Sequence, residues 1–517
     1  MLKNSYGIEV SINKEYLQEG YENLIDSVDD ARAKMGIKHL LYYVVIRELK
    51  DLSHLENVNV INKDDYLEMD VHTIRNLELV ETLRLKERTY SLIWLLDKTK
   101  TAMGSRMLKN WLLRPLKNRT IIESRYDKIE VLNNEFILKE ELRNNLNEVY
   151  DIERLCGKVI CGNLNARDLL QLKTSLKVFP LIKNIIKELK FDYEFDTFEN
   201  LYNLLETSLY ETPPISIKEG YLIKDGYNEE LDELKSIRRG GKDFIASFEN
   251  KIKEETGIKT LKIGYNRVFG YYIEVSKGQI KEIKEEFHWE RRQTLANYER
   301  YISPELKEKE SLILNAEERI IEMEYNLFLE IKELVKKEVL KLKKAALTLS
   351  ELDAITSLAV CAEELNLVRP EFSLNKDLEI IDGRHPVIEC VSKEEYVPND
   401  CVMKGDVRTL LITGPNMSGK STFMRQLAII VIMAQMGSFV PAKKAILPVI
   451  DKIFTRIGAS DDLVSGSSTF MVEMNEARNA ICNATENSLI LFDELGRGTA
   501  TYDGMSLAEA ILEYVNE

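Results

Sequence analysis

Apolar residues recur at spacings of three and four over residues 76–209. Leu92, Leu95, Leu96 and Met103 show this spacing, which places apolar side chains on one face of a helix. Turn-forming residues interrupt the pattern at three places: Arg114 with Pro115, Gly162 with Asn163, and Thr212 with Pro213 and Pro214. We therefore predict an all-helical domain over this region.

Later stretches have other patterns. Residues 260–276 are rich in β-branched and aromatic residues, which predicts a small β-ribbon. Residues 305–369 contain neither Gly nor Pro, so we expect one long helix or two helices end to end. From Asp382 onward, short apolar segments alternate with Gly-containing loops, as in an α/β domain.

Composition narrows the class of protein. A chain of 517 residues is too long to fold around a single hydrophobic core, so three or four domains are expected. Its 44% hydrophobic and 30% charged residues are typical of a soluble globular protein. The net charge of -15 argues against a chain that coats nucleic acid by bulk electrostatics. The longest strongly apolar run, Leu427–Met436, has half the length of a bilayer helix, and we expect a cytoplasmic protein without membrane contact.

The strongest chemical signal is a complete phosphate-loop motif, G-x-x-x-x-G-K-[ST]. The motif and the residue after it are Gly414, Pro415, Asn416, Met417, Ser418, Gly419, Lys420, Ser421 and Thr422. We expect an apolar strand at Thr409–Thr413 before the loop and a helix from Ser421 to Met436 after it. Backbone N–H groups and the helix N-terminus would bind phosphate. Lys420 should contact the β- and γ-phosphates of ATP, and the Ser421 hydroxyl should ligate Mg²⁺.

A second apolar run, Ser488–Phe492, ends in two carboxylates. This pattern predicts a buried strand that delivers Asp493 and Glu494 to its C-terminal edge. Asp493 is placed to hold the Mg²⁺ shell, and Glu494 to orient or deprotonate the attacking water. Alone, an Asp-Glu pair is usually a solvated turn, but its position after a phosphate loop favours the catalytic interpretation.

Hydroxyl residues lie between these two motifs. Ser467, Ser468 and Thr469 precede a helical run that starts near Phe470. Hydroxyls and free N–H groups at a helix start bind anions, and a γ-phosphate is the anion expected here. An ordinary N-cap is the alternative.

Six segments occur in an order typical of one family. They are LLDKTKTAMGSRMLKNWLLRPL (Leu95–Leu116), GYNEELDEL (Gly226–Leu234), RRQTLANYERYISPELKE (Arg291–Glu308), the phosphate loop TGPNMSGKST, FTRIGASDDLVSGSSTFMVEM (Phe454–Met474) and DELGRGTATYDG (Asp493–Gly504). In these segments, and along nearly its whole length, the chain resembles the MutS family of DNA mismatch repair ATPases.

The resemblance implies a multidomain, mostly α protein with an α/β P-loop (ABC-type) ATPase domain at the C-terminus and a small β-containing clamp. Residues 1–63 would be the remnant of a connector domain, 64–243 the first part of the helical core and lever, and 244–303 the DNA clamp. Residues 304–370 would be long lever helices returning to the core, and 371–517 an ATPase domain incomplete at its C-terminus. The family's mismatch-reading domain would be missing, and we expect weak or no steady-state hydrolysis.

The resemblance also implies roles for single residues. Lys420 and Glu494 would be catalytic, and Asn416 would join Lys420 in binding phosphates. Tyr396 stands where the family has an aromatic ring against adenine. Ser468 would act in trans, on nucleotide held by a second subunit.

For DNA contact the resemblance points to the clamp. Residues 251–300 hold 11 Lys or Arg against 8 Asp or Glu, inside a chain of net charge -15. Arg291, Arg292 and Arg300 are candidates for phosphate contacts, because sequence-blind clamping uses the DNA backbone. The alternative is a solvated, mixed-charge helix face.

The function implied is that of an ATP- and Mg²⁺-dependent DNA clamp that binds mismatched or damaged duplex DNA. Its expected partners are a second copy of the chain and a MutL-type repair protein, in the cytoplasm of a bacterium. One alternative is a MutS-like clamp for branched DNA or recombination control without mismatch reading. Others are the endonuclease-bearing paralogue and a chromosome-maintenance ATPase, whose coiled coil would need unbroken apolar heptads from Leu312 to Leu367.

Overall fold

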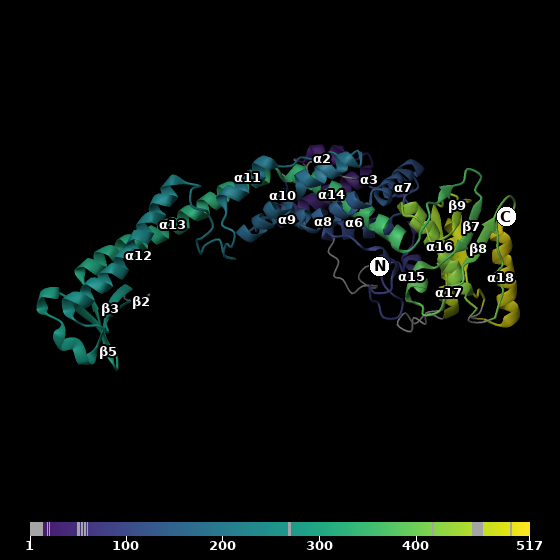
Figure 1. The fold of residues 1–517 in the computed structure, drawn as a ribbon. Coiled ribbons are helices and arrows are strands. Elements are labelled where there is room, and N and C mark those ends of the chain that lie inside the picture. Colours follow the sequence, from purple (N-terminus) through teal and green to yellow (C-terminus); the bar gives the residue numbers. More distant parts are fainter. Residues whose placement is uncertain are drawn as a thin grey trace. The chain divides into compact units, whose positions relative to one another are not determined.

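The computed structural model describes residues 14–17, 19, 21–48, 52, 55, 58, 60–266, 270–415, 418–457, 469–496 and 499–516. Helices dominate these residues, and their strands form three small sheets (Figure 1). The chain divides into two compact units. Unit 1 comprises residues 1–99, 105–136 and 354–517, and unit 2 comprises residues 100–104 and 137–353. Unit 1 is therefore built from both ends of the sequence.

Helices make up the first half of unit 2, as the apolar spacing predicts. They are α8 (Phe136–Asn147), α9 (Ile152–Ile160), α10 (Ala166–Glu188) and α11 (Glu199–Ser208). A capping box formed by Asn165 and Asp168 starts α10, which explains why the helix begins just after the predicted break at Gly162. The predicted stop at Pro213 is also confirmed, because no helix is assigned between α11 and Glu229.

The window without Gly or Pro forms two helices end to end, α13 (Pro304–Lys337) and α14 (Val339–Glu364). Helix α12 (Glu229–Thr256) runs beside α13 within unit 2 (Figure 1). Helix α14 is long and apolar enough to cross a membrane, which the apolar runs of the sequence did not predict. However, 89% of its most apolar window is buried inside the structure, as in the core helix of a globular protein.

Beyond α12 lies a four-stranded antiparallel sheet in the order β2-β3-β5-β4. Its strands are β2 (Lys262–Asn266), β3 (Gly270–Ser276), β4 (Glu290–Thr294) and β5 (Tyr298–Ile302). The first two strands confirm the predicted ribbon. One face packs on α12 around a core of Phe248, Ile252, Ile258, Leu261, Ile273, Val275, Tyr301 and Leu306.

The α-helices of unit 1 come from all three of its sequence segments. They are α2 (Glu22–Asp26), α3 (Ala31–Tyr42), α4 (Val71–Asn76), α5 (Leu92–Leu96), α6 (Ala102–Leu113), α7 (Arg119–Asn134), α15 (Pro386–Val391), α16 (Lys420–Met436), α17 (Thr469–Asn483) and α18 (Thr501–Asn516). The first residues of α6 belong to unit 2. Helix α16 is buried from Gln426 to Met436, which explains the apolar run in the sequence.

Unit 1 contains two sheets. A parallel sheet has the order β1-β10-β11, from β1 (Glu68–Met69), β10 (Lys452–Arg456) and β11 (Ser488–Phe492). The predicted strand before Asp493 is therefore confirmed, but its predicted burial is not, because β11 lies at the edge of the sheet that the structure describes and only Leu491 within it is buried. The second sheet has the order β6-β9-β7-β8, from β6 (Glu371–Phe372), β9 (Lys444–Leu447), β7 (Leu378–Gly383) and β8 (Asn399–Met403).

The strand predicted at Thr409–Thr413 is wrong. These residues lie in the described part of the chain without strand structure, and none of the described strands pairs with them. Leu411 is 81% exposed. Apolar composition alone does not make a strand, because each strand needs a neighbour for its backbone N–H and C=O groups.

Candidate functional site

The phosphate loop leads directly into α16, as predicted, and the helix begins at Lys420. Gly419 has φ of 88°, a left-handed conformation that glycine adopts at no steric cost. The Lys420 ammonium folds back over the loop and donates to the carbonyl oxygens of Gly414 and Pro415, each at 2.8 Å. Asn416 and Met417 lie outside the described residues.

Two predicted Mg²⁺ ligands lie in contact. The Ser421 hydroxyl, in the first turn of α16, donates a hydrogen bond to the Asp493 carboxylate at the end of β11. Both side chains are half-buried. A hydroxyl and a carboxylate are hard oxygen donors of the kind that Mg²⁺ prefers, and this ion usually keeps several waters and substrate phosphates as its other ligands. The donor set therefore fits Mg²⁺.

The chain turns sharply after β11. The Asp493 amide donates to the carbonyl oxygen of Arg456 at 2.8 Å, which continues the pairing of β10 and β11 by one residue. Glu494 follows with φ of 51° and is exposed. A left-handed backbone at a residue other than glycine is uncommon and occurs often at functional sites.

Tyr396 lies against the same helix. Its hydroxyl donates to Gln426 Oε1 of α16 at 2.8 Å, and burial raises its pKa. Near it, His385 is buried, and its Nδ1 accepts a hydrogen bond from the Ile388 amide at 3.3 Å. Burial, with a smaller contribution from Arg425, lowers the pKa of His385 to about 4.

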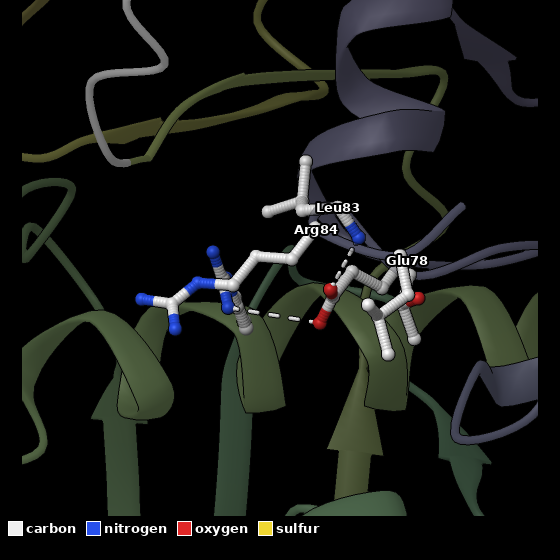
Figure 2. A pocket seen from close by; sticks show the side chains of 6 residues that line it. Glu78, Leu83 and Arg84 are labelled. Atoms are coloured by element: carbon white, nitrogen blue, oxygen red, sulfur yellow. Dashed lines mark hydrogen bonds and ion pairs between the residues drawn. The ribbon is translucent and has the colours of Figure 1, made fainter. Parts of the chain in front are cut away.

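A cavity of about 620 Å³ opens beside α16. Its lining residues are Glu78, Thr82, Leu83, Arg84, Leu85 and Arg425. Figure 2 shows Glu78 and Arg84 on the loop that borders it, with the Leu83 amide joined to the Glu78 carboxylate at 2.7 Å. Glu78 also faces Arg425 at 4.0 Å. Among the described residues, its lining does not include Lys420, Ser421 or Asp493.

Sequence reasoning missed a buried carboxylate at Glu473. This residue of α17 is 2% exposed and accepts a hydrogen bond from the Gly496 amide. The same carboxylate lies 4.0 Å from the Arg456 guanidinium. The signal was present in the sequence, because Glu473 interrupts the apolar run from Phe470 to Met474 and a buried charge needs a partner.

Helix α17 begins at Thr469, which confirms the helix predicted after the hydroxyl residues. Ser467 and Ser468 lie outside the described residues. The role in trans assigned to Ser468 by the resemblance therefore stays a prediction.

The three candidate arginines of the clamp lie on strands, so the alternative of a helix face is wrong. Arg291 and Arg292, on β4, have side chains 64% and 44% exposed, and each pairs with a carboxylate, Glu299 at 3.5 Å and Glu290 at 3.0 Å. Arg300, on β5, is 18% exposed and donates to Glu274 on β3 and to Gln293 on β4, each at 3.0 Å. It also stacks over Tyr272, 4.1 Å from the ring centroid. The Arg300 side chain therefore ties the sheet together.

Two protein-family models match the chain. "MutS domain III" matches residues 72–359, and "MutS domain V" matches residues 410–517. The second match begins just before the phosphate loop and includes the strand that delivers Asp493.

Curated relatives match over nearly the whole chain. The DNA mismatch repair protein MutS of Geobacillus sp. (strain WCH70) is 53% identical, over all of this chain and 61% of that protein. The same-named protein of Bacillus subtilis (strain 168) is 52% identical over the same shares. That of Bacillus cytotoxicus is 54% identical over 97% of this chain and 57% of that protein. The chain thus spans about three fifths of the length of these relatives.

Proposed function

The chain belongs to the MutS family, and on that premise we propose that it is an ATP-binding and ATP-hydrolysing DNA clamp of mismatch repair. The contact between Ser421 and Asp493 supports this most directly, since the two residues lie 72 positions apart and both are expected to serve Mg²⁺. Residues 371–517 would form the ABC-type P-loop domain, and the bound nucleotide would govern the grip on duplex DNA.

ATP phosphates would bind over the start of α16. Lys420 already lies across the loop with its ammonium on two carbonyl oxygens, and negatively charged phosphates would draw it away from these neutral acceptors. Backbone N–H groups of Ser418 to Thr422 lie at the N-terminus of the helix, where its dipole favours anions. The Tyr396 hydroxyl binds Gln426, six residues after Lys420 in α16. From this position Tyr396 would pack on the adenine.

Ser421 and Asp493 would hold Mg²⁺. The bound ion would neutralise charge on the phosphates. Glu494 follows Asp493 directly, and its left-handed backbone turns the chain at the edge of the sheet. Its carboxylate would orient the attacking water and accept a proton from it. Ser468 would complete the nucleotide site of a second copy of the chain.

The sheet β2-β3-β5-β4 would contact DNA. Arg291 and Arg292 present exposed guanidinium groups on β4, suited to phosphate oxygens and not to base edges. The DNA would be mismatched or damaged duplex. A MutL-type repair protein would be a further partner, and the protein would act in the bacterial cytoplasm.

Nucleotide binding tests this proposal. A fluorescent ATP analogue titrated into the chain with Mg²⁺ should bind, and Lys420→Ala should weaken binding by at least about 10-fold, because a hydrogen bond to a charged group contributes about 1.5–3 kcal/mol. Lys393→Ala, at an exposed lysine of unit 1, removes the same charge elsewhere and should leave the affinity unchanged. Equal affinities for the Lys420 variant and the unsubstituted chain would contradict the assignment.

A further inference from the structure

Glu473 joins three elements around the end of β11. It lies in the second turn of α17, and its carboxylate accepts the Gly496 amide, three residues after Asp493. The same carboxylate faces Arg456, the last residue of β10, at 4.0 Å. One buried side chain therefore links α17, the end of β10 and the turn that follows Asp493.

The turn that Glu473 holds is conformationally demanding. Glu494 and Gly496 have φ of 51° and 87°, so two of the three residues after Asp493 are left-handed. A β-carbon on Gly496 would lie 2.5 Å from the carbonyl oxygen of Gly504 in α18. Such a turn persists only when its surroundings determine it. The Gly504 backbone packs on one part of the turn, and the Glu473 carboxylate binds its amide.

Charge neutralisation of Arg456 does not require Glu473. Glu476, one turn further along α17, lies 3.2 Å from Arg456 Nε. Burial raises the pKa of Glu476, and the charges of Arg456 and His72 act against this rise. The contact that belongs to Glu473 and not to Glu476 is the hydrogen bond from Gly496. This difference points to a role for Glu473 in the turn.

We propose that Glu473 is a positioning residue for the Mg²⁺ site: by fixing the turn after β11 to α17, it sets how the Asp493 carboxylate meets Ser421 and the metal. The inference rests on the proposed ATP- and Mg²⁺-binding function. It adds a regulatory consequence, since a displacement of α17 is transmitted through Glu473 and Gly496 to Asp493. The affinity for Mg²⁺ then depends on the position of α17.

The experiment measures binding of a fluorescent ATP analogue at a series of free Mg²⁺ concentrations. Glu473→Met removes the acceptor for Gly496 and should raise the Mg²⁺ concentration for half-maximal enhancement by about 10-fold. Its Mg²⁺-free affinity for the nucleotide should not change, because Lys420 and the loop backbone provide it. Glu473→Gln keeps an uncharged acceptor, so it should restore part of the Mg²⁺ affinity and leave a rise of about 3-fold.

Glu476→Met is the matched control, because Glu476 lies on the same helix and contacts Arg456 but not Gly496. It should leave the Mg²⁺ dependence unchanged. An unchanged Mg²⁺ dependence in Glu473→Met, or an equal shift in Glu476→Met, would overturn the inference about Glu473 but not the proposed function. Absence of Mg²⁺-dependent binding in the unsubstituted chain would instead overturn the proposed function. If Glu473→Met does not fold, Glu473→Gln provides the test. The Mg²⁺ concentration for half-maximal enhancement should then rise by about 3-fold, because the uncharged acceptor is weaker. No rise would contradict the inference.

Discussion

His385 couples the stability of unit 1 to pH. Its pKa is about 4 in the folded protein and about 6.5 in an unfolded chain. Between about pH 4 and pH 6.5, His385 is therefore neutral in the folded state and protonated in the unfolded state. The stabilisation is fully present above about pH 6.5 and is lost as the pH falls toward 4.

We expect this loss to reach about 3 kcal/mol, since each pKa unit corresponds to about 1.4 kcal/mol. His385→Asn keeps an N-cap acceptor for the Ile388 amide and does not titrate. Thermal unfolding at pH 7.5 and pH 4.5 should show a smaller fall in Tm for this variant than for the unsubstituted chain. Equal falls would show that His385 does not carry the pH dependence.

Arg291 and Arg292 should bind DNA phosphate, whereas Arg300 should stabilise the sheet. Replacing the first two with Ala should weaken duplex binding and reduce the slope of log affinity against log salt by about 2, or about 0.9 for each phosphate that is no longer neutralised. Fluorescence anisotropy of a labelled duplex measures both quantities. The double variant Lys341→Ala with Lys344→Ala, at two exposed lysines of α14, is the charge-matched control. A slope equal to that of the control would contradict phosphate binding by these arginines.

At the scale of elements, a buried ion pair fixes the base of α12 against α13. Lys235 on α12 and Glu324 on α13 are 3% and 1% exposed, and their charged groups lie 3.3 Å apart. The Lys235 ammonium also donates to the Ile223 carbonyl at 2.6 Å, and the Glu324 carboxylate accepts the Leu222 amide at 3.2 Å. Hydrogen bonds from Tyr210 and Arg239 hold the pKa of the neighbouring Asp225 below its usual range.

Lys235→Met leaves the Glu324 charge buried without its cation. We expect a loss of about 3–5 kcal/mol in the stability of unit 2. Combining it with Glu324→Leu removes the stranded charge and should recover most of this loss. Urea unfolding of the two single variants and the double variant measures the coupling, and simple additivity would exclude a direct pair.

Helices and strands that follow from the residues of their own segment were predictable from the sequence. Strands that form only by pairing with a distant segment were not. The ribbon at 260–276 and the two helices after Pro304 follow from composition and from the positions of Gly and Pro. Strand β4 contains Glu290, Arg291 and Arg292 and lacks the alternation of a half-buried strand. Strand β1 has two residues and exists through its pairing with β10, far along the chain. Thr409–Thr413 has the composition of a strand but no strand partner among the described residues.

The candidate site follows the same division. Lys420, Ser421 and Asp493 were predictable because phosphate-loop chemistry fixes residue type and spacing. The Glu473 contact with Gly496 depends on how α17 packs against the turn after β11, and spacing does not encode that. Likewise, the sequence predicted only that Arg300 is a basic residue of the clamp. The pairing of β3, β4 and β5 shows that its side chain hydrogen-bonds to Glu274 and Gln293 within the sheet.

At the scale of the whole molecule, we expect nucleotide bound in unit 1 to alter the hold of unit 2 on DNA. Unit 1 contains Lys420, Ser421 and Asp493, and unit 2 contains the sheet with Arg291 and Arg292. Such coupling requires that ATP bind with different affinity to the DNA-free and DNA-bound states. The effect must be reciprocal, so duplex DNA should change the affinity for ATP by the same factor.

The most direct measurement is the lifetime of the chain on an end-blocked duplex after a jump to high salt, with and without ATP and Mg²⁺. We predict that ATP changes this lifetime several-fold in the unsubstituted chain and leaves it unchanged in Lys420→Ala. A lifetime unaffected by ATP, under conditions where the nucleotide is shown to be bound, would contradict the proposed coupling.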